Sequence, residues 1–297
     1  MKRLTCLSSI FFLLVSVLSG CNKEDYKQDN FNPDMGEMVS YSQTTNQHGS
    51  TILETIYENG SRLYFQVMSD ATLKVVNYSY YYNESYDKES EYLFKGNLVI
   101  PESIEAMGKT FPVTSMAAKA FYKCKGMLSA VLPNNITIIP ELAFGECSNL
   151  KEIHLPDSLQ SIGSEAFVVC GLTEIDIPPA TKAIGYHAFT SCHNLSEIIF
   201  HNGLQNIGIE AFSYCKAESV TIPTSVRKVN YKAFYGYTKY LTFLSQVPPE
   251  IGTEDHGGVI INKDNLIGIK VPRTAIESYR LAPTWKNLYS YYLIGID

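Results

Sequence analysis

Apolar residues return along the middle of the chain in a pattern that repeats every 22 to 23 residues. Each copy ends in a short segment with apolar residues at spacings of three and two, as in Leu150, Ile153 and Leu155. Cys stands three residues after the Phe of an Ala-Phe pair in five copies, and Tyr stands there in the sixth. The six pairs are Ala120-Phe121, Ala143-Phe144, Ala166-Phe167, Ala188-Phe189, Ala211-Phe212 and Ala233-Phe234. A fixed period of this length predicts a stack of similar coils.

One such coil is too short to bury its own apolar side chains. Stacking covers them, because the Phe, Ile and Leu of each coil pack on their equivalents above and below. Burial of one Phe or Leu contributes about 1.5 to 3 kcal/mol. We therefore expect one continuous core through all six copies, with alternate residues of each terminal segment pointing inward as in a strand.

Non-repeating segments flank the repeats on both sides. Residues 62–68 and 72–76 alternate between apolar and polar and are separated by a turn, which predicts a β-hairpin, and residues 97–101 predict a strand leading into the first coil. After the repeats, residues 267–272 predict a strand and 274–280 a short helix. An open end of a stack exposes unpaired strand edges, so we expect these segments to act as caps.

The order Pro, Leu or Val, Ile-Gly, Ala-Phe, Cys and then a strand resembles the BspA-type leucine-rich repeat of bacterial surface proteins, over roughly residues 60–297. The resemblance implies an α/β fold, a leucine-rich-repeat solenoid of about six coils of 22–23 residues over residues 111–245. It also implies an N-terminal β-hairpin cap over 51–110 and a C-terminal strand-helix cap over 246–297. Members of the family are associated with adhesion to host matrix proteins, which implies a binding function at the cell surface.

The first 20 residues have the pattern of a targeting segment. Lys2 and Arg3 precede a short apolar run over residues 10–18. The tetrapeptide that ends in Cys21, Leu-Ser-Gly-Cys, resembles the lipobox of bacterial lipoproteins, which implies that Cys21 becomes the lipidated first residue. More than one acyl chain on this residue would hold the protein firmly to a bilayer. An ordinary secretory signal that is cut nearby is the alternative.

Residues 22–25, Asn-Lys-Glu-Asp, resemble the export signal that sends lipoproteins of Bacteroidetes to the outer face of the outer membrane. The resemblance implies an outer-membrane lipoprotein exposed at the surface, although a solvated linker has a similar composition. Residues 21–50 are mostly polar, which predicts a flexible tether.

The chain is acidic, with 24 Lys and Arg against 30 Asp and Glu, a formal net charge of −6. Removal of residues 1–20 takes away Lys2 and Arg3, which leaves 22 basic residues and a charge of −8. Nucleic acid is disfavoured as a partner, because its binding depends on basic clusters that face phosphates. We expect a protein or glycan partner, and contact with a membrane only through the lipid anchor.

The sequence contains no HExxH, GxSxG, phosphate-loop or calcium-loop motif, which indicates a non-enzymatic protein without a cofactor. The repeat cysteines stand one coil apart, in a ladder that does not converge tetrahedrally, so zinc is disfavoured. We expect them to be small buried residues with weak hydrogen-bonding capacity. Cys192 precedes His193, which would suit a thiol nucleophile, but Cys192 occupies the repeated structural position.

Residues between the inward positions of each predicted strand face the opposite surface, which is the concave side in leucine-rich-repeat proteins. They form two columns: Ser129, Glu152, Glu174, Glu197, Ser219 and Thr242, and Val131, His154, Asp176, Ile199, Thr221 and Leu244. Three successive glutamates repel one another without a structural return. Our hypothesis is that Glu152, Glu174, Glu197, His154, Asp176, Val131, Ile199 and Leu244 contact a partner with basic groups; a merely solvated face is the alternative.

Five tyrosines occur within residues 78–86. Binding surfaces use such residues, because tyrosine offers a large contact area at low entropic cost. A strand with tyrosines on both faces explains the run equally simply. Two functions remain: a cell-surface adhesion module, or a structural or accessory lipoprotein of an outer-membrane complex.

Overall fold

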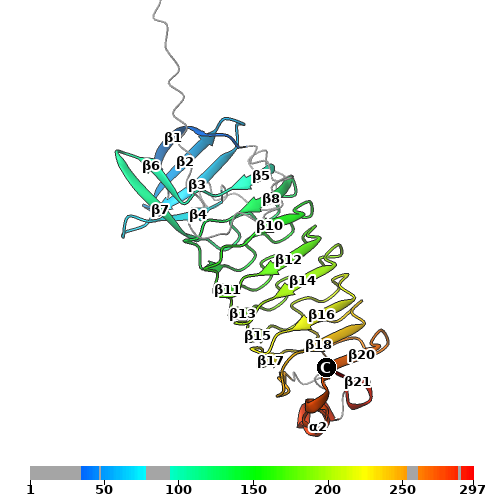
Figure 1. The fold of residues 1–297 in the computed structure, drawn as a ribbon. Helices are drawn as coiled ribbons and strands as arrows, with labels where there is room; N and C mark the ends of the chain where they lie inside the picture. Colours follow the sequence, from blue (N-terminus) through cyan, green and yellow to red (C-terminus); the bar gives the residue numbers. More distant parts are fainter. Residues whose placement is uncertain (1–34, 47, 78–93, 253–259, 287–288) are drawn as a thin grey trace, which may run out of the picture. The chain divides into compact units, whose positions relative to one another are not determined.

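A computed structural model describes residues 35–46, 48–77, 94–252, 260–286 and 289–297, all within one compact unit, Pro33–Asp297. Cys21 and the tyrosine run at 78–86 lie outside the described residues. The described residues are mostly strands, and their helices are short and confined to 273–292. Parallel coils stacked along one direction form most of the unit (Figure 1).

A six-stranded sheet precedes the coils. Its strands are β1 (Met38–Thr45), β2 (Thr51–Tyr57), β3 (Arg62–Val67), β4 (Leu73–Val76), β7 (Lys109–Met116) and β6 (Ser103–Ala106), in that spatial order (Figure 1). The predicted hairpin is confirmed as β3 and β4, which pair antiparallel. β4 then pairs in parallel with β7, which connects the hairpin to a segment close to the first coil. The N-terminal cap is thus a whole sheet built around the predicted hairpin.

The strand β1 corrects the prediction of a flexible tether over residues 21–50 in the part from Met38 to Thr45. It pairs antiparallel with β2, and Met35, just before it, is buried in the core. Seven of its eight residues are exposed, so both faces carry polar side chains and the apolar alternation of a half-buried strand is missing. Backbone pairing holds the segment in place without that signal.

The longer strands of the coils lie along one side of the stack. They are β5 (Gly96–Val99), β8 (Met127–Val131), β10 (Glu152–His154), β12 (Glu174–Ile177), β14 (Glu197–Phe200), β16 (Ser219–Ile222), β18 (Tyr240–Phe243), β20 (Gly268–Pro272) and β21 (Leu293–Ile296). Neighbours pair in parallel, and pairing is interrupted between β10 and β12 and between β14 and β16, where the strands still lie side by side. This side forms the strand face.

Two-residue strands line a second side of each coil. They are β9 (Ile138–Ile139), β11 (Ser161–Ile162), β13 (Ala183–Ile184), β15 (Asn206–Ile207), β17 (Lys228–Val229) and β19 (Glu250–Ile251), and they form one continuous parallel sheet. The second residue of every pair is buried, because it points into the coil. These residues belong to the Ile-Gly position of the sequence repeat and its variants.

A third side, which we call the arc, contains the Ala-Phe segment and consists of turns. The amide of each Phe donates to the carbonyl of the Ala in the next coil, at 2.7–2.8 Å between successive coils from Phe121 to Phe212. Backbone hydrogen bonds therefore join the coils on the arc without a strand. Positive φ angles recur two residues before and two residues after the Phe, at Lys119, Lys123, Leu142, Glu146, Glu165, Val169, His187, Ser191, Glu210, Tyr214 and Lys232.

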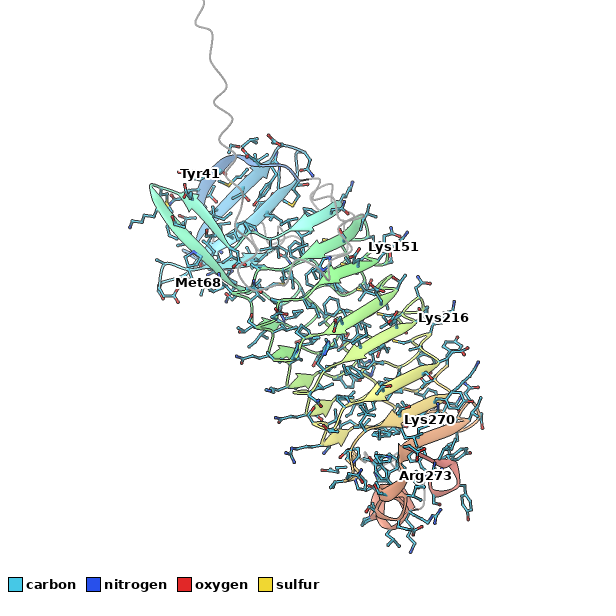
Figure 2. The ribbon with its side chains drawn as sticks, in the orientation of Figure 1. Tyr41, Met68, Lys151, Lys216, Lys270 and Arg273 are labelled. Carbon is cyan, nitrogen blue, oxygen red and sulfur yellow. The ribbon has the colours of Figure 1, made fainter. Side chains whose placement is uncertain are left out.

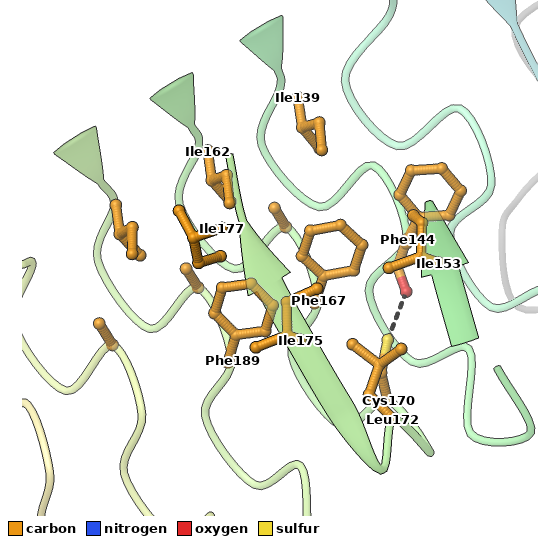
Figure 3. Packing of buried hydrophobic residues seen from close by; sticks show 14 of the residues in the cluster. Ile139, Phe144, Ile153, Ile162, Phe167, Cys170, Leu172, Ile175, Ile177 and Phe189 are labelled. Carbon is orange, nitrogen blue, oxygen red and sulfur yellow. Dashed lines mark hydrogen bonds between the residues drawn. The ribbon is translucent and has the colours of Figure 1, made fainter. Parts of the chain in front are cut away.

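The core contains a stack of phenylalanine rings from all six copies. Successive rings from Phe121 to Phe234 stack nearly parallel with centroids 4.9–5.6 Å apart. Figure 3 shows Phe144, Phe167 and Phe189 among buried residues of the same cluster that come from the two strand sides, such as Ile175 and Ile162. The expected continuous core is confirmed.

The five repeat cysteines lie buried beside the phenylalanines. The Sγ of Cys170 is 3.1 Å from the carbonyl oxygen of Phe144, and Cys147, Cys192 and Cys215 contact the corresponding Phe carbonyl at 3.1–3.2 Å. Burial raises the pKa of Cys124 and of Cys192 to about 12. The expected role is confirmed, because each thiol stays protonated and donates a weak hydrogen bond inside the stack.

The last coil is closed by a segment with the strand and helix that the sequence predicts. After β20 come a 3-10 turn at Arg273–Ala275, the helices α2 (Ile276–Leu281) and α3 (Pro283–Lys286), a second 3-10 turn at Ser290–Tyr292, and β21 (Figure 2). Trp285 is fully buried, and its indole donates to the carbonyl of Pro249 at 2.8 Å. Its ring meets Phe243, Tyr279 and Tyr289 edge-on, which covers the end of the phenylalanine core.

Candidate binding surfaces

The strand face carries two columns of outward side chains, as predicted for the first five copies. Glu174 lies opposite Glu197, and Asp176 opposite Ile199. Glu152 lies opposite Ser129, and His154 opposite Val131. The alternation follows from burial: in β12 and β16 the residues in between are buried and the column residues are exposed.

The sixth copy departs from the prediction. Ser219 lies opposite Tyr240 and Thr221 opposite Thr242, so Tyr240 ends the first column and Thr242 belongs to the second. Leu244 lies beyond the end of β18 and outside both columns, although it is exposed. The reason is the length of the turn between arc and strand: Phe234 precedes its column residue Tyr240 by six positions, whereas the corresponding separation in the other copies is seven or eight.

Four carboxylates gather on the central part of the strand face. Two of them have a histidine partner: Glu152 Oε1 is 3.1 Å from Nε2 of His154, and Asp176 Oδ1 is 2.7 Å from Nε2 of His201. Glu174 and Glu197 face each other across a parallel pair, where two negative charges repel. The central strand face therefore has a negative potential that favours a cationic group.

The apolar residues proposed to contact a partner differ in their exposure. Ile199 is 39% exposed, whereas Val131 is half-buried. Ser129 is buried, and its hydroxyl donates to Asn97 Oδ1 at 2.9 Å, which removes it from the available surface. The strand face thus joins the exposed residues Glu174, Asp176, Glu197 and Ile199 with the half-buried Glu152 and His154.

Three residues that the sequence analysis missed also belong to this face: His201, Tyr240 and Lys270. His201 follows β14 directly and reaches back to Asp176. Lys270 lies opposite Thr242 in β20, and its ammonium stands 5.1 Å from the ring centre of Tyr240. Lys270 could have been predicted to lie there, because it belongs to the strand predicted at 267–272. That strand adds one further residue to each column.

A second group of exposed side chains lies on the arc and has no counterpart in the sequence analysis. Tyr186, Tyr214 and Tyr237 are exposed on the arc of the fourth, fifth and sixth copies. His187 and Lys232 approach Glu210 from the neighbouring copies on either side, with N···O distances of 3.7 and 4.0 Å. The group could have been found from the sequence, because tyrosines occur there at positions that vary between the repeat copies.

Cys192 and His193 adjoin each other in the sequence but do not act as a pair. Cys192 is buried with a raised pKa, and His193 instead directs Nδ1 to the carbonyl of Tyr214 at 3.2 Å, so the pair does not form a thiol nucleophile with its base. Within the described ranges, no three His, Cys, Asp or Glu residues are grouped as ligands for a metal ion. Over the same ranges, no helix has the length and apolar character that a membrane span requires.

Solved structures similar to this chain include three leucine-rich repeat proteins. A leucine-rich repeat protein from T. pallidum is 28% identical, with a TM-score of 0.49, and the match covers 60% of this chain and 81% of that one. A leucine-rich repeat protein from Bacteroides capillosus is 24% identical, with a TM-score of 0.38, and the match covers 47% of this chain and 94% of that one. One from Bacteroides ovatus is 18% identical, with a TM-score of 0.34 and coverage of 82% and 71%. The comparison with curated proteins gave no match.

The comparison with protein families identifies the repeats. Residues 114–241 match the family described as BspA type leucine rich repeat region, in six copies. The matched range contains all six Ala-Phe pairs and the strands from β8 to β17. Together with the stacked coils and the phenylalanine core, this match shows that residues 114–241 are a leucine-rich repeat region of the BspA type.

Proposed function

We propose that this protein is a non-enzymatic binding module of the bacterial cell surface, anchored by lipid on Cys21, whose strand face contacts a protein partner with basic groups. One observation carries the proposal: Glu174 and Glu197 are exposed and directly opposite each other, with Glu152 and Asp176 nearby. A fold rarely keeps like charges in register unless something offsets their repulsion. A cationic partner would do so.

The neighbouring side chains add to the support. Ile199 offers an apolar contact between the acidic side chains. The carboxylates of Glu152 and Asp176, which pair with His154 and His201, can also accept a hydrogen bond from a donor of the partner. Complementary charge mainly raises the association rate and the specificity, so binding should weaken as salt rises. A binding function in general is also supported, because a repeat scaffold presents an extended surface and can vary its exposed residues freely.

Reversal of three glutamates tests the proposal. The chain from residue 22 is immobilised, and a soluble octalysine peptide serves as the basic probe. The variant with Glu152, Glu174 and Glu197 changed to Lys should lose at least tenfold in affinity, since each reversal turns an attraction into a repulsion.

The matched control reverses Glu105, Glu141 and Glu165, which lie away from the strand face and cause the same change in net charge. Equal losses in the two triple variants would mean that only net charge matters, and the strand face would no longer be a candidate. Protease treatment of intact cells separates an outward-facing module from an accessory lipoprotein of the periplasmic side.

A further inference from the structure

A row of tyrosines lies on the arc of the last three repeat copies, on a different side of the coil from the strand face. We call Tyr186, Tyr214, Tyr231, Tyr235 and Tyr237 the tyrosine ridge. Tyr186 is 46% exposed, Tyr214 42% and Tyr237 55%, while Tyr231 and Tyr235 are partly buried. In the second and third copies the same stretch carries Glu, Leu, Ser, Gly and Val, and Cys at the position of Tyr237, so the coil itself does not require aromatic residues there.

Contacts between neighbours make the ridge one continuous surface. The ring of Tyr186 stacks on His187 with centroids 3.8 Å apart, and Tyr214 meets Tyr235 of the next copy edge-on at 5.9 Å. Lys232 stands 5.0 and 5.1 Å from the ring centres of Tyr231 and Tyr235. These contacts hold the rings in place before any ligand arrives, which lowers the entropic cost of binding.

A carboxylate lies among the rings. Glu210 is partly buried, with His187 at 3.7 Å on one side and Lys232 at 4.0 Å on the other. Both distances exceed that of a hydrogen bond, so the carboxylate oxygens can accept one from a ligand hydroxyl. The ridge therefore alternates aromatic rings with hydrogen-bonding groups of both signs.

The chemistry of the ridge selects the kind of ligand. A pyranose has an apolar face of C–H groups that packs on an aromatic ring, and hydroxyls at its edge that bond to carboxylate, imidazole and ammonium groups.

We propose that the tyrosine ridge binds a polysaccharide across the arc of the fourth, fifth and sixth coils. A protein partner fits less well, because protein interfaces combine aromatic and aliphatic residues at their centre. The exposed large hydrophobic side chains on the described arc of these coils are all tyrosines. Each of them carries a hydroxyl.

The test begins with an array of defined plant, bacterial and host oligosaccharides, probed with the chain from residue 22. Calorimetry then measures the affinity of the bound glycan at lengths of two to six sugars. Affinity should rise with glycan length until the glycan spans the ridge, and then level off. Tyr186→Ala and Tyr214→Ala should each weaken binding about five- to tenfold.

Tyr122→Ala is the matched control, since Tyr122 lies on the arc of the first copy and outside the ridge. It should leave glycan affinity unchanged, as should reversal of Glu152, Glu174 and Glu197. Thermal melting checks that each variant is folded. The inference is overturned if the folded protein binds no oligosaccharide of the array, if the ridge variants bind as the parent does, or if Tyr122→Ala weakens binding equally.

Discussion

The inner and outer sides of the arc belong to the same few residues of each copy, yet they follow opposite rules. Inward positions carry Ala, Phe and, in five copies, Cys, all buried, whereas the outward positions between them range from Lys and Glu to Val and Tyr. Both sides share one backbone path with the same hydrogen bonds between coils. Stability therefore depends on the inward residues, and the outward ones are available for binding.

The difference follows from the contacts that the two sets of side chains make. An inward side chain touches the equivalent residue in two neighbouring coils, so a change in one copy disturbs three. An outward side chain touches mainly solvent and one or two neighbours. The predictions below separate the two sides by their effects on stability.

Truncation of one inward phenylalanine should have the largest effect. Phe167 is fully buried and stacks on Phe144 and Phe189 at 5.3 and 5.0 Å. Phe167→Ala should lower the free energy of unfolding by about 3–5 kcal/mol, through lost burial and the cavity left in the stack. Denaturation by urea, followed by circular dichroism, measures the loss.

Tyr186→Ala on the outward side is the matched comparison, because it also removes an aromatic ring from the arc. It should change the free energy of unfolding by no more than about 0.5 kcal/mol. If both variants lost the same amount, the arc would have no distinct inner side and the stacked core would not be what stabilises the coils.

The division between inward and outward residues also decides what could be predicted from sequence. The period, the Phe and Cys positions and the stacked core were predictable, because each inward residue meets its own equivalent and is repeated. The columns of the strand face were predicted in five copies and failed in the sixth, where a shorter turn moves Tyr240 and Thr242 into the columns. The tyrosine ridge was missed, since outward positions vary from copy to copy and leave no period. β1 was missed because backbone pairing, without an apolar pattern, defines it.

The inward cysteines predict a specific response to alkaline pH. Burial raises the pKa of Cys192 to about 12, so the folded thiol keeps its proton while the unfolded thiol loses it near pH 8.5. Above that pH the unfolded state is favoured, and stability should fall by about 1.4 kcal/mol per pH unit for each such thiol until the folded pKa is reached. Cys192→Ala should be less stable at pH 7 and lose stability more slowly between pH 9 and 11.

Urea midpoints measured across this pH range show the change of slope. Thr181→Val is the control, because Thr181 is buried and donates to the carbonyl of Leu159 at 3.0 Å but has no thiol. It should lower stability at pH 7 and keep the slope of the parent protein. Parallel slopes for the parent and Cys192→Ala would contradict a protonated thiol in the folded core.

The smallest effect should come from the outward residues with positive φ. Val169 is exposed and has φ of 57°, where a β-branched side chain is strained. Val169→Gly should be more stable than Val169→Ala by about 1 kcal/mol, since glycine adopts this conformation without a clash. At the neighbouring Val168, where φ is not positive, the order should reverse, with glycine below alanine by about 0.5–1 kcal/mol. Urea denaturation of the four variants measures both differences. The same order at both residues would mean that the backbone of the arc relaxes around its side chains.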